Sequence, residues 1–159
     1  MSFIDPEIYY KSLPKKRSAA GAIILNQADE ILFVKSDYKN YWSIPGGATE
    51  ENESPRETCI RETKEEVGID LLNPKLLCVD YVSGKDGKGE NFQFIFFGGK
   101  LSPAAIKKIK VDGQEIKEYR FMPITEAWPM LNKKYQNRLP ACLKALKDDT
   151  AIYFENDKY

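Results

Sequence analysis

The stretch GGATEENESPRETCIRETKEEVGID, from Gly46 to Asp70, differs in charge from the rest of the chain. From residue 47 onward it holds eight acidic and three basic side chains, hence a formal charge of −5, whereas the whole chain of 159 residues is neutral. Such a concentration of carboxylates either forms a solvated acidic surface or binds cations. Which of the two applies decides what the sequence predicts about function.

The same stretch contains the signals that begin and end a helix. Ser54, Pro55 and Glu57 match a capping box, with serine at the cap, proline in the first turn and glutamate three residues after the serine. Gly68 follows the last residue of the periodic pattern and is a typical stop signal. The sequence therefore predicts a helix over about residues 55–67.

Three carboxylates, those of Glu62, Glu65 and Glu66, are predicted to share one edge of this helix. At about 100° per residue they fall within an arc of about 100°, beside the arc that would face the core. Like charges three and four residues apart repel by about 0.2–0.5 kcal/mol per pair. A hard cation such as Mg²⁺ or Mn²⁺, which prefers carboxylate oxygens and water, would remove this repulsion. A solvated acidic helix face is the alternative interpretation.

Composition indicates a globular protein, since 42% of the residues are hydrophobic and 12% aromatic. We expect one domain over residues 1–159, with an N-terminal arm over 1–16. The longest apolar runs are shorter than the roughly 20 residues of a membrane helix, and the N-terminus does not resemble a secretory signal. Three widely spaced cysteines are typical of buried, reduced thiols in a cytoplasmic protein. The neutral net charge gives no support for a nucleic-acid partner.

The chain contains no histidine. This excludes Ser-His-Asp and Cys-His catalysis and any zinc site with a histidine ligand. Proton transfer in an enzyme of this sequence would have to use Glu, Asp, Lys, Tyr or metal-bound water.

Strands and helices are predicted without strict β-α alternation, which favours an α+β fold or a layered α/β/α domain. The apolar segments 18–25 and 31–36 read as a hairpin, and 74–84 and 91–101 as strands on either side of a turn-rich segment, 83–90. A further strand is expected near 115–124, a short helix or loop near 102–110, and a helix that starts near Pro140.

From Gly47 the chain reads G-x5-E-x7-R-E-x-x-E-E-x-G-I, through Glu53, Arg61, Glu62 and the residues up to Ile69. This spacing resembles the signature of the Nudix hydrolases, which cleave the diphosphate link in nucleoside diphosphates joined to another group. Thr63 departs from the pattern, because an aliphatic residue is usual there. The resemblance covers about residues 17–124 and implies a Nudix-like mixed β-sheet between helices, an α/β/α sandwich. Outside it, we expect a C-terminal helical segment and tail over 125–159.

The resemblance also implies roles for the residues of the motif. Glu62, Glu65 and Glu66 would bind Mg²⁺ or Mn²⁺, with Glu62 as the base toward the attacking water. The carbonyl of Gly47 would be a further metal ligand. Arg61 would hold the loop and the glutamates in place through ion pairs.

Outside this set the assignments are less specific. Glu53 would be the partner of Arg61, and Glu115, with Glu118 as the second choice, would supply one more carboxylate from outside the motif. Other candidates for substrate contacts are two aromatic residues that could stack on a base or ribose and a lysine that could meet phosphate: Tyr41, Trp42 and Lys35. Ordinary exposed or packing roles are the alternatives for these residues.

The sequence thus predicts metal-dependent hydrolysis of a diphosphate linkage in a small nucleotide-type compound, with a nucleoside triphosphate or an ADP-ribose-like compound favoured. A non-hydrolytic domain that binds or senses a nucleotide on the same fold is the main alternative. An isomerase such as isopentenyl diphosphate isomerase is disfavoured by the lack of a suitably placed thiol, and a purely structural domain should show no stabilisation by metal. A homodimer is suggested by the resemblance alone.

Overall fold

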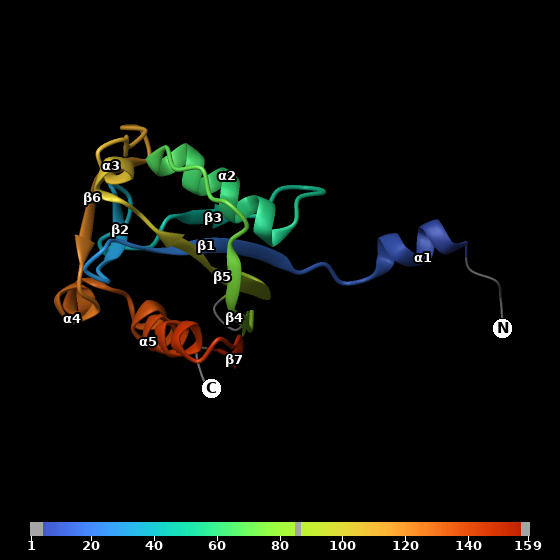
Figure 1. The fold of residues 1–159 in the computed structure, drawn as a ribbon. Coiled ribbons are helices and arrows are strands. Elements are labelled where there is room, and N and C mark those ends of the chain that lie inside the picture. Colours follow the sequence, from blue (N-terminus) through green and yellow to red (C-terminus); the bar gives the residue numbers. More distant parts are fainter. Residues whose placement is uncertain (1–4, 85–86, 157–159) are drawn as a thin grey trace.

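The computed structural model describes residues 5–84 and 87–156. Within these ranges the strands form one seven-stranded mixed sheet in the order β6-β2-β1-β5-β4-β7, with β3 paired to β1 (Figure 1). The strands are β1 (Arg17–Leu25), β2 (Ile31–Ser36), β3 (Gly46–Ala48), β4 (Lys75–Val82), β5 (Asn91–Lys100), β6 (Ile116–Met122) and β7 (Ile152–Glu155). The helices are α1 (Pro6–Ser12), α2 (Pro55–Val67), α3 (Pro103–Ile106), α4 (Ile124–Ala127), the 3-10 turn η1 (Trp128–Met130) and α5 (Lys133–Lys147).

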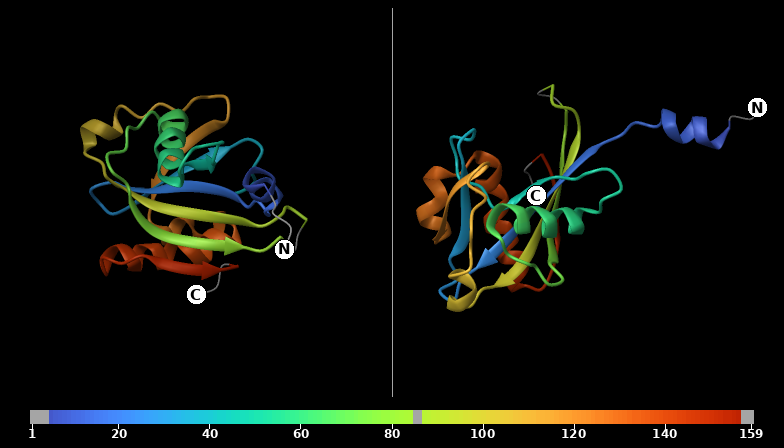
Figure 2. Two further views of the ribbon diagram at one scale, coloured as in Figure 1. Left: turned by 90° about the vertical axis from the view of Figure 1, so that its right-hand side faces the viewer. Right: turned by 90° about the horizontal axis from the view of Figure 1, so that it is seen from above.

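The central strands are apolar on both faces, because successive side chains point to opposite sides of the sheet. Ile23 of β1 and Phe33 of β2 belong to the core that contacts α5, whereas Ile24 and Leu32 belong to the core that contacts α2. A sheet buried on both faces needs a covering layer on each side. Figures 1 and 2 show α2 and α5 on opposite faces of the sheet, so the predicted α/β/α sandwich is confirmed.

Helix α2 has the predicted bounds. The Ser54 hydroxyl accepts a hydrogen bond from the Glu57 N–H at 3.3 Å, and the Glu57 carboxylate accepts one from the Ser54 N–H at 2.8 Å. Gly68 ends the helix with φ +73°, in the left-handed region that glycine adopts without strain. Thr63, the residue that departs from the family pattern, is fully buried against the sheet on the face shared with Val67.

The predicted hairpin of β1 and β2 and the antiparallel pair β4 and β5 are confirmed. Residues 85–86, within the predicted turn between β4 and β5, lie outside the described residues. The short helix near 102–110 is α3, and its cap is Ser102 as expected. All three cysteines are buried and free. Among the residues that the structure describes, no helix is both long and apolar enough to cross a membrane.

The predicted start of the C-terminal helix near Pro140 is wrong. Helix α5 begins at Lys133, where the Asn132 side chain caps it by accepting a hydrogen bond from the Tyr135 N–H at 2.9 Å. Pro140 lies inside the helix, although its ring removes one N–H donor from the helical ladder. The burial of Leu139 and Cys142 against the sheet outweighs this cost.

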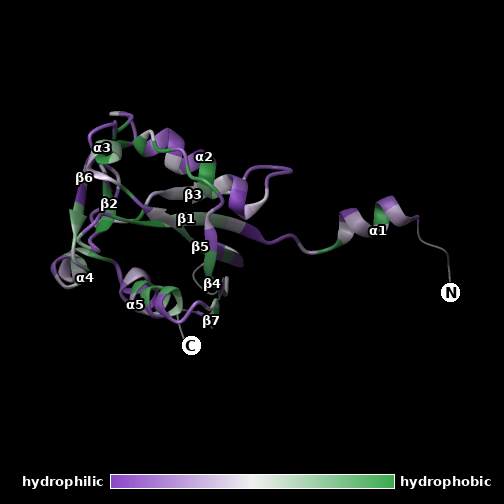
Figure 3. Ribbon diagram, viewed as in Figure 1, coloured by the Kyte–Doolittle hydropathy of each residue, from purple (hydrophilic) through white to green (hydrophobic). Residues whose placement is uncertain are grey.

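Several elements were not predicted, among them strand β7 and helix α1. Strand β7 pairs in parallel with β4 at the far edge of the sheet. Helix α1 begins after Asp5, whose side chain caps it, and stands away from the sheet at the end of an extended segment (Figure 1). Every residue from 5 to 17 is exposed, and Figure 3 shows hydrophobic residues beside hydrophilic ones on α1.

A buried ion pair joins α5 to the sheet. Arg138 of α5 donates from Nε to Oδ2 of Asp80 on β4 at 2.6 Å, and the two residues are 4% and 0% exposed. Because both charges are removed from water, each depends on the other for compensation.

We expect Asp80→Ala to lower the free energy of unfolding by about 3–5 kcal/mol, because it leaves the Arg138 guanidinium buried without its carboxylate. Urea denaturation measures this change. Asp70→Ala is the matched control: it breaks an exposed pair with Lys64 and should cost no more than about 1 kcal/mol. Equal effects of the two substitutions would contradict a structural role for the buried pair.

Candidate active site

Two glycines bring the acidic segment close to the centre of the sheet. Gly46 and Gly47 of β3 pair with Gly21 and Ala20 of β1. A Cβ atom on Gly46, where φ is +148°, would lie 2.3 Å from the Ala20 carbonyl oxygen. A Cβ atom on Gly47 would lie 2.4 Å from the carboxyl carbon of Glu62. The Glu62 carboxyl therefore packs directly on the Gly47 backbone, in the space that a side chain would fill.

Arg61 connects the loop to the helix. Its Nε and Nη2 donate to the two oxygens of Glu53 at 2.8 and 3.0 Å, a bidentate arrangement that suits the planar guanidinium. Nη1 donates to Glu62 at 2.8 Å and to Glu65 at 3.1 Å, and Nη2 also reaches the Ala48 carbonyl at 3.1 Å. The ion pairs expected for Arg61 and Glu53 are thus present in the structure.

Glu53 is held as a carboxylate by its surroundings. Besides Arg61, it accepts hydrogen bonds from the Glu50 N–H at 3.0 Å and from the Thr58 hydroxyl at 2.9 Å. The hydrogen bond from Arg61 is the main cause that lowers the pKa of Glu53 to about 2, with the Glu50 and Thr58 hydrogen bonds acting in the same direction against partial burial.

Glu62 and Glu66 have the opposite environment. Glu66 is 4% exposed and accepts a hydrogen bond from the Gly46 N–H at 2.8 Å. Burial raises the pKa of Glu66 to about 8, and the neighbouring charge of Glu62 adds to this. Burial also raises the pKa of Glu62, against the effect of Arg61. A divalent cation would compensate the negative charge that burial disfavours here.

The helix edge does not by itself assemble a metal site. Within the ranges 5–84 and 87–156, no group of three or more His, Cys, Asp or Glu side chains has metal-binding geometry. Arg61 Nη1 holds one oxygen each of Glu62 and Glu65, and the Glu65 side chain is 60% exposed. The oxygen donors fit the chemistry of Mg²⁺ or Mn²⁺, and an ion that used the two oxygens held by Nη1 would have to replace those contacts.

Glu62 lies at a cavity of about 370 Å³ between the sheet, α2 and α5. Glu115, from the loop before β6, lines the same cavity, and its carboxylate accepts a hydrogen bond from the Tyr38 hydroxyl. Burial and this hydrogen bond raise the pKa of Tyr38. The charge of Glu115 also contributes to the raised pKa values of Glu62 and Glu66. The structure therefore brings Glu115 to the carboxylates of α2.

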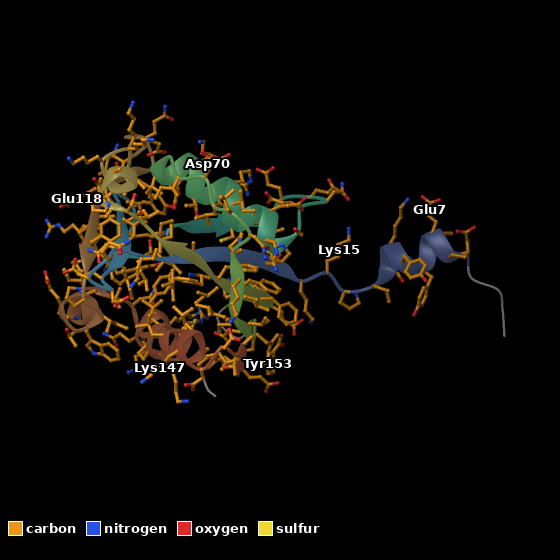
Figure 4. All side chains as sticks on the ribbon, viewed as in Figure 1. Glu7, Lys15, Asp70, Glu118, Lys147 and Tyr153 are labelled. Atoms are coloured by element: carbon orange, nitrogen blue, oxygen red, sulfur yellow. The ribbon has the colours of Figure 1, made fainter. Side chains whose placement is uncertain are left out.

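This cavity is not lined by the predicted substrate contacts, Tyr41, Trp42 and Lys35, or by Glu118, the second choice for the extra carboxylate. Trp42 is 7% exposed and packs in the core, with the Arg120 guanidinium 5.2 Å from its ring centroid. Lys35 donates to the Lys39 carbonyl at 2.7 Å. Glu118 pairs with Arg120 at 2.6 Å on the edge strand β6, at the outside of the molecule (Figure 4). These residues thus have packing, turn and surface contacts in the structure, and the roles predicted for them stay predictions.

Sequence reasoning missed other residues of the cavity wall, namely Tyr38, Lys39, Gln93, Tyr135 and Arg138. For Arg138, the sequence did contain a signal. Arg138 stands in the apolar run of α5, beside Leu139 and four residues before Cys142, where a charge needs a buried partner. Tyr41, the remaining predicted contact, lines a second cavity of about 230 Å³.

The structure is a sheet between two helical layers, with an acidic helix beside a glycine-rich strand. The model of the NUDIX domain matches residues 15–145, and the chain belongs to the Nudix family. It is 39% identical over 64 residues to an uncharacterized Nudix hydrolase, YvcI, of Bacillus subtilis, which covers 40% of each chain.

Two further relatives show the extent of the likeness. The m7GpppN-mRNA hydrolase of Saccharomyces cerevisiae is 28% identical over 134 residues, or 80% of this chain and 13% of that protein. The NUDIX domain of Shewanella oneidensis NrtR, solved in complex with ADP ribose, aligns with a TM-score of 0.71 at 16% identity, over 90% of this chain and 99% of that one. The chain therefore spans less than half the length of the curated relatives from Bacillus subtilis and Saccharomyces cerevisiae.

We expect Glu53→Gln to lower the free energy of unfolding by about 1–3 kcal/mol near neutral pH, because it weakens the charged hydrogen bonds to Arg61. The pKa of Glu53 falls from 4.5 to about 2 on folding, so this stabilisation is present above pH 4.5 and is lost as the pH falls toward 2. Denaturant titrations across this range measure the difference between variant and wild type.

Glu51→Gln serves as the control, because it removes an exposed carboxylate of the same loop. It should change the free energy of unfolding by less than about 0.5 kcal/mol. A Glu53→Gln difference that stays constant between pH 5 and pH 2 would rule out the ion pair as its cause.

Proposed function

We propose that this protein hydrolyses a diphosphate linkage in a small nucleotide-type compound with the help of Mg²⁺ or Mn²⁺. The observation that carries the proposal is the pair of buried or half-buried carboxylates, Glu62 and Glu66, which have raised pKa values beside the Gly46–Gly47 backbone at a cavity. Membership of the Nudix family supports it.

Glu62, Glu65, Glu66 and the Gly47 carbonyl are the groups that would hold the metal. A bound divalent ion lowers the pKa of water and neutralises charge that develops on phosphate oxygens. Because each carboxylate keeps an oxygen that makes no hydrogen bond with another described residue, ligands are available without unfolding the helix. Glu115 is the candidate for one more ligand from outside α2.

The residues of the chain perform three other tasks. Glu62 accepts the proton of the attacking water, and its raised pKa suits a general base that works near neutral pH. Arg61 is a positioning residue, because it fixes Glu62 and Glu65 relative to the Ala48 carbonyl. Glu53 keeps the Arg61 guanidinium in its plane through the bidentate contact.

The size of the cavity and the relatives support a nucleotide substrate. A volume of about 370 Å³ is in the range of pockets for small molecules. The Shewanella oneidensis domain was solved with ADP ribose, and the yeast relative is named as a hydrolase of m7GpppN-mRNA. A nucleoside triphosphate or an ADP-ribose-like compound is therefore the substrate class that we propose.

A non-hydrolytic nucleotide-binding domain is the second candidate. The observation that favours it is the engagement of Glu62 and Glu65 by Arg61, which competes with metal binding. Nucleotide binding without any product, at saturating Mg²⁺ and Mn²⁺, would select this candidate over the hydrolase.

We expect Glu65→Gln and Glu66→Gln each to reduce turnover by roughly 100-fold or more while the fold persists, because each removes a negatively charged ligand without changing its shape. Product release from a panel of nucleoside triphosphates and ADP-ribose, with Mg²⁺ or Mn²⁺, measures the effect. Metal should also raise the melting temperature of the wild type more than that of either variant.

Glu51→Gln, in the same acidic segment but outside the predicted ligand set, should keep the wild-type rate. Near wild-type turnover in Glu65→Gln or Glu66→Gln would overturn the proposed hydrolytic function.

A further inference from the structure

The cavity beside Glu62 adjoins the second cavity, of about 230 Å³. Both are lined by Gln93 of β5 and by Tyr135 and Arg138 of α5, so these three side chains form a common wall. The two cavities are therefore adjacent, and a ligand bound beside Glu62 would have to pass these three side chains to reach the second cavity.

The second cavity is basic. Its lining includes Arg17, Lys88, Lys134 and Arg138, and among the described residues that line it none is acidic. Arg138 is compensated by Asp80. In the part of the chain that the structure describes, the other three cations form no ion pair with a carboxylate, so three positive charges converge on one small space. A polyanionic ligand would relieve this repulsion.

The register of the strands places the basic cavity at one end of a groove. Odd-numbered residues of β1 face α5, and along β5 they are paired as Gly21 with Ile95, Ala19 with Gln93, and Arg17 with Asn91. Along the floor of the groove the side chains thus change from the apolar Ile95, through the amide of Gln93, to the cation of Arg17. Arg17 lies three residues along β1 from Ala20, which pairs with Gly47, so about 10 Å of strand separates these two backbone positions.

Two further contacts complete the basic end of the groove. The Arg17 guanidinium donates to the Lys88 carbonyl, which fixes it beside the loop between β4 and β5. The amino end of α5, with Asn132 and Lys134, forms another wall, and the partial positive charge of a 15-residue helix adds to the field there. The fork of an arginine together with two lysines suits phosphate oxygens.

We propose that the second cavity binds a phosphate group of the substrate that lies outside the scissile diphosphate, through Arg17, Lys88 and Lys134. The inference rests on the proposed function and refines it: the preferred substrates are nucleotide compounds with a chain of more than two phosphates, and compounds whose only phosphates are the scissile pair leave the basic cavity unused.

The test uses the full chain and the double variant Lys88→Gln/Lys134→Gln; Lys88 is exposed, Lys134 is half-buried, and both are outside the metal-binding set. The matched control is Lys107→Gln/Lys108→Gln, which removes the same charge from an exposed segment after α3. We compare an adenosine tetraphosphate compound with ADP-ribose as substrates. The Lys88/Lys134 variant should raise KM for the tetraphosphate by about tenfold, with kcat within twofold, and leave both constants for ADP-ribose unchanged.

Binding is measured separately from turnover, by titration calorimetry of inorganic tripolyphosphate and pyrophosphate without metal. Wild type and control should bind tripolyphosphate about tenfold more tightly than the Lys88/Lys134 variant, with a strong dependence on salt. Equal weakening by the control variant, or no change in either assay, would overturn the basic subsite. If no compound is hydrolysed but tripolyphosphate binding is lost in the variant, the proposed function fails and the subsite stands.

Discussion

The contacts of the Arg61 guanidinium are the constraint on which the candidate active site depends. One planar group joins Glu53 of the loop, the Ala48 carbonyl of β3 and two carboxylates of α2. Without this cation, Glu62 and Glu65 would repel each other across one turn of helix. The same contacts limit metal binding: an ion gains the Glu62 and Glu65 oxygens that Nη1 holds only as Nη1 releases them, while Glu53 retains the guanidinium through its own pair of hydrogen bonds.

The sheet supplies the second requirement, a rigid platform that backbone can approach closely. Strand β1 is flanked by β2 and β5 and also pairs with β3 through glycines. Since β3 precedes α2 in the chain, this pairing holds the acidic helix near the centre of the sheet. A Cβ atom added at Gly46 would clash with the Ala20 carbonyl, and one added at Gly47 would clash with the Glu62 carboxyl. Close packing of this kind explains why Glu66 is buried and why its pKa is raised, since little water reaches its carboxyl group.

Short stretches of sequence predicted those features that depend on neighbouring residues. The bounds of α2 follow from the Ser54 cap and from Gly68, whereas the contact of Arg61 with Glu53 was implied by the family resemblance. The start of α5 could not be found in this way, because tertiary burial of its apolar face outweighed the proline signal. The pair of Asp80 and Arg138 joins residues 58 positions apart, and no local pattern specifies it. Trp42 shows a third limit: residue type indicates an aromatic surface, but only packing decides whether that surface faces the core or a ligand.

The neutral charge of the chain conceals a separation of charge along the groove. Carboxylates of α2 and Glu115 gather at one end, and Arg17, Lys88 and Lys134 at the other, with Gln93 and Tyr135 between them. A polyphosphate would be attracted directly by the basic end but repelled by the carboxylate end, where a divalent cation must first reverse the local charge. The two ends therefore act differently on the same ligand. The basic end stabilises the bound substrate, whereas the metal end stabilises the charge that develops in the transition state. Since the Asp80–Arg138 pair fixes α5, which carries the wall between them, the spacing of the two ends depends on a buried contact outside both.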